Sequence, residues 1–215
     1  MLATFLFEIG AALYVVWRYR LTTMTRLITA MLVLLATFQG TEFLLCGGAG
    51  VPSGIWSQIG YASITLLPPL GIHLAHALAG KKGRTLVWLG YATAAMFVAY
   101  FVFATQAISG HTCYANYAVF DVTRASAMLY SLYYYGWLLI GIALSFHFAQ
   151  SLSKKRRLPL YALMFGYLSF LVPTTTVNLL DPDTIGGIPS IMCGFAVILA
   201  FILVRKIAPT SLKRR

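Results

Sequence analysis

Acidic residues are scarce in this chain: five Asp and Glu stand against sixteen Lys and Arg in 215 residues. Charged residues of both signs make up only 10% of the sequence, whereas hydrophobic residues make up 60%. A typical water-soluble domain carries about 25% charged residues. The shortage of charge therefore excludes an ordinary soluble domain and indicates an integral membrane protein.

Most of the chain falls into long apolar runs. A bilayer-spanning helix needs about 20 mostly apolar residues, and seven segments come close to this requirement. They are Leu2 to Trp17, Leu27 to Leu45, Ile55 to Ala79, Leu86 to Ala107, Ala125 to Gln150, Leu158 to Leu179 and Ile188 to Val204. No basic residue precedes the first run, so we expect a retained helix rather than a signal peptide. The sequence predicts an all-α polytopic membrane protein, with residues 1–215 forming a single seven-helix transmembrane domain.

Every Lys and Arg except Arg124 lies in one of four clusters that follow alternate apolar runs. The clusters are Arg18, Arg20 and Arg26; Lys81, Lys82 and Arg84; Lys154 to Arg157; and Arg205, Lys206, Lys213, Arg214 and Arg215. Because loops rich in Lys and Arg stay cytoplasmic, we predict an outer N-terminus and a cytoplasmic C-terminus. The net charge of +11 comes without a nucleic-acid motif, so the expected partner is the lipid bilayer rather than nucleic acid.

Two of the three cysteines fall on the predicted outer side. Cys46 follows the second run, and Cys113 lies in the outer segment 108–124, which we expect to form a lid. An oxidising compartment favours a Cys46–Cys113 disulfide. The alternative is two free thiols, because spacing alone does not give the separation that a bridge requires. Cys193 is predicted to be a small packing residue.

A weak internal repeat relates the first three helices to the last three. Gly54-Ile55-Trp56-Ser57 resembles Gly187-Ile188-Pro189-Ser190 in sequence, and chance similarity is the alternative. The resulting parallel 3+1+3 layout is similar to that of SWEET and PQ-loop carriers and of microbial rhodopsins. The chain departs from both groups, because it has no Pro-Gln pair at the end of its first or fifth helix and no Lys inside its seventh.

Two short motifs carry a further resemblance. Gln39-x-x-Glu42 in the second run and Ser190-x-x-Cys193-x-Phe195-Ala196 in the seventh resemble signatures of uncharacterised bacterial seven-helix membrane proteins. This resemblance implies a multi-pass protein of the bacterial inner membrane. It transfers no activity.

Carboxylates inside apolar runs are the first candidates for a functional site. Glu8 lies in the first run, and Glu42 lies one turn from Gln39 in the second. Because a charged carboxylate in hydrocarbon is costly, such residues usually face the bundle interior or a wet cavity. The structural alternative is a neutral glutamate hydrogen-bonded to another helix.

Further polar residues are predicted at the same outer depth. The complete predicted ligand-binding set is Glu8, Gln39, Glu42, Gln106, Ser131, Tyr134, Thr175 and Asn178. Aromatic faces combined with carboxylates suit an organic cation. An interfacial tyrosine belt with interhelical hydrogen bonds is the alternative.

The histidines give a hypothesis of a different kind. His73, His76 and His147 fall near the predicted inner side and could hold zinc or haem, although no cofactor is expected. Catalytic residues are not expected either, because only His111 lies at the depth of Ser53 and Ser190.

The leading hypothesis from the sequence is a small-solute carrier that binds a polar or cationic ligand from outside. A ligand sensor or membrane scaffold acting through a cytoplasmic partner is the alternative, and the redox or metal protein comes third. The sequence leaves a homo-oligomer open.

Overall fold

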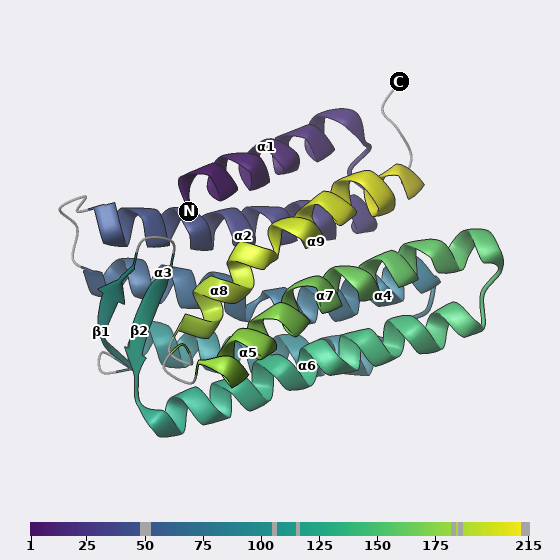
Figure 1. Cartoon of the computed structure of the whole chain (residues 1–215). Coiled ribbons are helices and arrows are strands. Elements are labelled where there is room, and N and C mark those ends of the chain that lie inside the picture. Colours follow the sequence, from purple (N-terminus) through teal and green to yellow (C-terminus); the bar gives the residue numbers. More distant parts are fainter. Residues whose placement is uncertain (48–52, 105–106, 115–116, 182–183, 185–186, 212–215) are drawn as a thin grey trace.

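A computed structural model describes residues 1–47, 53–104, 107–114, 117–181, 184 and 187–211. It is a bundle of helices with a small β-hairpin at one end (Figure 1). The elements are α1 (Leu2–Arg18), α2 (Thr23–Gly47), α3 (Ser53–Thr65), α4 (Leu67–Ala79), α5 (Arg84–Phe103), β1 (Ile108–Cys113), β2 (Ala118–Val122), α6 (Arg124–Gln150), α7 (Lys154–Leu180), α8 (Ile188–Phe195), α9 (Val197–Ile202), η2 (Leu203–Ile207) and η3 (Ala208–Thr210).

Six helices of the described chain are long and apolar enough to cross a membrane. The pair α3–α4 and the continuous segment from α8 to η3 each count as one of them, together with α2, α5, α6 and α7. Helix α1, the first predicted span, has 17 residues and is not in this set. The helical architecture and multi-pass membrane character expected from the apolar runs are thus supported by six helices.

Two of the membrane-length helices are interrupted. Helix α3 ends at Thr65 and α4 starts at Leu67, directly before Pro68 and Pro69. Proline has no backbone N–H, so it fits the first turn of a new helix better than the interior of a continuous one. The second interruption separates α8 from α9 at Ala196, whose N–H bonds to the carbonyls of both Met192 and Cys193.

The predicted lid contains a two-stranded antiparallel sheet, β1–β2, that a purely helical fold does not include. Helix α5 accordingly ends at Phe103, before the Ala107 boundary that the apolar run suggests. Alternation explains β2: Ala118 and Phe120 are buried, whereas Asp121 is exposed. The β-favouring side chains of this segment suit a half-buried pleated surface.

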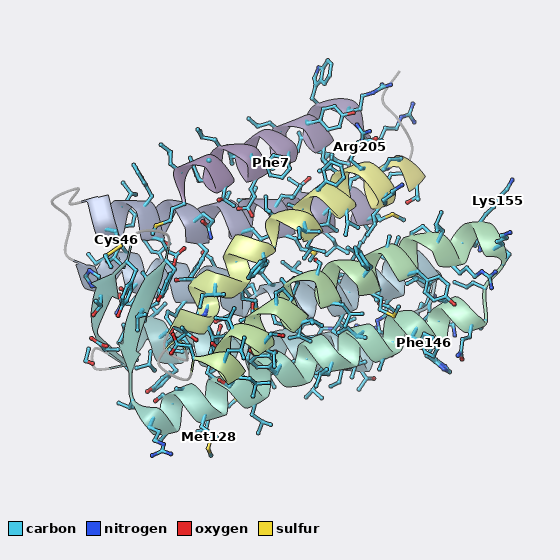
Figure 2. The ribbon with its side chains drawn as sticks, in the orientation of Figure 1. Phe7, Cys46, Met128, Phe146, Lys155 and Arg205 are labelled. Carbon is cyan, nitrogen blue, oxygen red and sulfur yellow. A yellow bond between two sulfur atoms is a disulfide. The ribbon has the colours of Figure 1, made fainter. Side chains whose placement is uncertain are left out.

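The two ends of the bundle differ in chemistry. The described residues of all four basic clusters lie in terminal turns of helical segments or in the connections between them at one end of the bundle, where Figure 2 shows Lys155 and Arg205 far from Cys46. Lys213, Arg214 and Arg215 lie outside the described residues. We call these the basic end and the hairpin end. At the hairpin end a disulfide joins Cys46 to Cys113, with a Cα–Cα distance of 5.8 Å, and so fixes β1 to α2.

Candidate functional site

A cavity of about 260 Å³ lies beneath β2 at the hairpin end. It is bordered by α3, α5, β2, α6 and α8, and we call it the hairpin-end cavity. Its lining residues are Tyr61, Ile64, Phe101, Phe120, Val122, Arg124, Ala127, Tyr130, Ser131, Tyr134, Tyr135, Ile188, Pro189 and Met192. Most of the lining is apolar or aromatic, as in ligand pockets generally. Arg124 is the charged residue of this set.

Aromatic rings form one wall of the cavity. Tyr61 meets Phe120 edge to face at 5.3 Å between ring centroids, and Phe101 meets Tyr130 in the same way at 5.1 Å. Edge-to-face pairs at these separations are favourable because a ring edge is positive and a ring face is negative. The rings therefore brace one another, and the wall has a defined shape.

The break between α3 and α4 positions two tyrosines of α6. The Thr65 carbonyl would normally accept a hydrogen bond from residue 69, but Pro69 has no N–H to donate. The Tyr133 hydroxyl donates to this carbonyl at 2.7 Å instead, and the Tyr130 and Thr65 hydroxyls lie 3.1 Å apart. The proline pair thus leaves an acceptor open, and α6 satisfies it.

A much smaller chamber of about 20 Å³ continues from this cavity toward the middle of the bundle. Tyr134 and Met192 border both spaces. The chamber also touches Leu67 and Ala196, which mark the two helix interruptions. It has room for about one water molecule, so these side chains close the deep end of the hairpin-end cavity.

Glu42 belongs to a buried hydrogen-bond network beside the cavity. The Ser190 hydroxyl bonds to the Glu42 carboxyl, lies 2.7 Å from the Ala118 carbonyl oxygen and accepts from the Ala118 N–H at 3.2 Å. The network connects α2, α8 and β2. A serine hydroxyl has one hydrogen, so Ser190 can donate either to Glu42 or to the Ala118 carbonyl. Both contacts are hydrogen bonds at the same time only when Glu42 is protonated and donates to the Ser190 oxygen. The protonation state of Glu42 therefore decides whether Ser190 can hold the Ala118 carbonyl.

Glu8 is the second buried acid. Its side chain has 0% exposure, and neither carboxyl oxygen has a hydrogen-bond partner among the described residues. It lies on the face of α1 that includes Ala11, Ala12 and Val15. A buried polar group without a partner is costly, and acids within apolar helices are therefore candidates for a functional role.

The predicted ligand-binding residues occupy different places. Ser131 and Tyr134 line the hairpin-end cavity, whereas Glu8, Gln39 and Glu42 are buried outside its lining. Thr175 donates to the Leu171 carbonyl within α7, and Asn178 accepts from Thr184. Gln106 lies outside the described residues.

Sequence reasoning missed several cavity residues on the hairpin and at its end. Phe120 and Val122 come from β2, and Arg124 begins α6. Two signals pointed to them. Val119, Phe120 and Val122 are residue types that favour strands, and Arg124 is the one basic residue outside the four clusters.

The three histidines predicted on the inner side do not gather into a metal site among the described residues. No group of three or more His, Cys, Asp or Glu side chains there has suitable geometry. His73 Nδ1 lies 3.3 Å from the Tyr91 hydroxyl, and His76 Nδ1 lies 2.9 Å from the Ile72 carbonyl oxygen. His147 packs against Phe148 with ring centroids 6.0 Å apart. Zinc and haem binding stay predictions without support from this geometry.

Comparison with protein-family models, curated proteins and solved structures finds no match to this chain.

Proposed function

We propose that the protein is a small-solute carrier whose ligand enters the hairpin-end cavity. The observation that carries the proposal is the aromatic-walled cavity of about 260 Å³, which narrows at Tyr134 and Met192. A space of this size suits a small molecule of one or two rings. Its position beneath the hairpin gives the ligand access from one end of the bundle.

In this proposal the hairpin end faces outside and α1 is a seventh span. The clustering of Lys and Arg at the opposite end supports the orientation, because such loops stay cytoplasmic. The Cys46–Cys113 disulfide agrees with it, since disulfides persist in oxidising compartments.

The lining favours a ligand with an apolar body and an anionic or neutral polar end. Arg124 borders the cavity, whereas Glu42 lies outside the lining. A guanidinium pairs with carboxylate, sulfonate or phosphate groups, and the rings offer stacking surface. The sequence instead suggests a cationic ligand paired with a carboxylate. Such a ligand would have to reach Glu42, which lies outside the cavity lining.

Transport, rather than binding alone, is supported by the two helix interruptions. In carriers built from repeats, discontinuous helices commonly surround the site near the bilayer midplane. Here both interruptions, at Leu66 and Ala196, fall in the third helix of a predicted triplet, and residues beside both touch the small chamber. Glu8, which is buried, is the proposed proton-coupling acid.

A pair of adjacent tryptophan substitutions tests the cavity. Ser131→Trp fills it, whereas Leu132→Trp changes a neighbouring side chain that is 74% exposed and faces away from the bundle. Binding of naphthalene-2-sulfonate and of a naphthyl trimethylammonium ion is measured on purified protein in nanodiscs. We expect the sulfonate to bind wild type and Leu132→Trp better than the cation, and Ser131→Trp to lose it by at least about tenfold.

Two results would count against the proposal. Equal sulfonate binding by both variants would remove the cavity as the site. Binding without protein-dependent uptake into liposomes would reject the carrier and favour the sensor.

A further inference from the structure

A second cavity, at the basic end, has a volume of about 740 Å³. Three separate segments enclose it: the connection before α2, the α4–α5 region and the end of the described chain after η3. Its lining residues are Thr22, Thr23, Met24, His73, His76, Ala77, Lys81, Lys82, Gly83, Arg84, Val87, Trp88, Thr210 and Ser211. We call it the basic-end cavity, and neither the carrier proposal nor the predicted ligand set uses it.

The charge of this cavity has one sign. Lys81, Lys82 and Arg84 line it, and none of its described lining residues is acidic. Lys81 is partly oriented, because its ammonium nitrogen lies 4.7 Å from the centre of the Phe148 ring. A cation over an aromatic face is held by the ring quadrupole. The α4–α5 loop thus presents three cations with no opposing carboxylate in the same lining.

His76 is held with one nitrogen toward this loop. Its Nδ1 must donate to the Ile72 carbonyl at 2.9 Å, because a carbonyl oxygen only accepts. Its Nε2 lies so close to Gly83 that a Cβ at that position would be 1.8 Å away. Gly83 therefore lets the imidazole approach the loop. Nε2 is thus the ring nitrogen that faces the α4–α5 connection.

The remaining lining is amphipathic. Thr22, Thr23 and Ser211 bring hydroxyl groups, while Met24 and Val87 are apolar. Trp88, in the first turns of α5, is 66% exposed. Tryptophan is enriched at the level of lipid head groups. The cavity therefore combines cations, hydroxyls and an apolar rim at one depth.

We propose that the basic-end cavity binds a phosphate group, either in the head group of an anionic lipid or as a free phosphate. Phosphate has several strong acceptor oxygens and negative charge, which match three cations and hydroxyl donors. A topology signal alone would need only positive charge in the loop. The start of α7 supplies that comparison, since Lys154 and Lys155 are also basic but do not line the cavity.

The test uses two double variants that remove equal charge. Lys82→Gln with Arg84→Gln changes the cavity lining, and Lys154→Gln with Lys155→Gln changes the basic first turn of α7. All four side chains are exposed, so we expect both proteins to fold. Native mass spectrometry compares retention of phosphatidylglycerol and phosphatidylcholine, and thermal unfolding is followed with and without inorganic phosphate against matched chloride.

A lipid site requires wild type and the Lys154/Lys155 variant to prefer phosphatidylglycerol, with the preference falling about tenfold in the Lys82/Arg84 variant. A free-phosphate site requires inorganic phosphate to raise the unfolding temperature of wild type and of the Lys154/Lys155 variant. The unfolding temperature of the Lys82/Arg84 variant should not change. Equal lipid preference and equal phosphate response in all three proteins would overturn the proposal. So would an equal loss in both double variants, because it would indicate general attraction by surface charge.

Discussion

Replacing Ser190 by alanine should destabilise the protein far more than a typical serine substitution. The hydroxyl is the meeting point of α2, α8 and β2, where it contacts the Glu42 carboxyl and both backbone groups of Ala118. Removing it leaves buried polar groups without this partner. Each such loss costs about 1–3 kcal/mol, and part of the bonding relaxes, so we expect a decrease of about 2–4 kcal/mol in the free energy of unfolding.

Ser63→Ala is the matched control for this substitution. Ser63 is also buried, but its hydroxyl donates at 2.7 Å to the Ile59 carbonyl within its own helix. Such bonds add little, so the expected change is below about 1 kcal/mol. Unfolding in mixed micelles with increasing sodium dodecyl sulfate, followed by circular dichroism, gives both values.

A double-mutant cycle with Glu42→Gln separates the contact from general packing. Coupling between Glu42→Gln and Ser190→Ala should be at least about 0.5 kcal/mol, because the two side chains share one hydrogen bond. If Ser190→Ala and Ser63→Ala lower the free energy of unfolding equally, the network does not hold the hairpin, and the reasoning is wrong.

Two other perturbations follow from the packing of the bundle. Gly71→Ala would place a Cβ 1.5 Å from the Tyr167 hydroxyl oxygen and should lower the free energy of unfolding by about 1–3 kcal/mol. Gly10→Ala meets no atom within 4 Å and should be neutral or stabilising in the same unfolding assay. A larger loss for Gly10→Ala than for Gly71→Ala would contradict the helix packing. Reduction of the Cys46–Cys113 bridge, which spans 67 residues, should lower the free energy of unfolding by at most about 4 kcal/mol. Intact mass after alkylation should show both thiols only after reduction, and labelling without reductant would rule the bridge out.

Hydrophobic runs and basic clusters were sufficient to predict most of the helices. The predicted segment Ala125 to Gln150 corresponds to α6 at Arg124–Gln150, because apolar length and flanking charge are local properties. The break before Pro68 was also foreseeable from proline chemistry. The hairpin was not foreseen, since its strands are short and Ala118 and Phe120 are buried only through contacts distant in sequence.

The site was harder to predict than the fold. Depth along a helix can be read from the sequence, and Ser131 and Tyr134, which were placed at one depth, line the same cavity. Rotation about the bundle axis cannot be read in this way, which is why Gln39 and Glu42 share the predicted outer depth but lie outside the cavity lining. The link from Glu42 to Ser190 joins positions 148 residues apart, beyond any local pattern.

The shortness of α1 has a consequence for the surrounding lipid. Its 17 residues span about 25 Å, whereas the 25 residues of neighbouring α2 span about 37 Å. The hydrocarbon core of a bilayer is about 30 Å thick, so α1, as the proposed seventh span, would leave a deficit of about 5 Å on its side of the bundle. We expect the bilayer to thin locally there. Glu8 lies about 10 Å from the start of the helix, and this hydrophobic mismatch would shorten the path by which a proton from the hairpin-side solution reaches an otherwise sealed carboxyl.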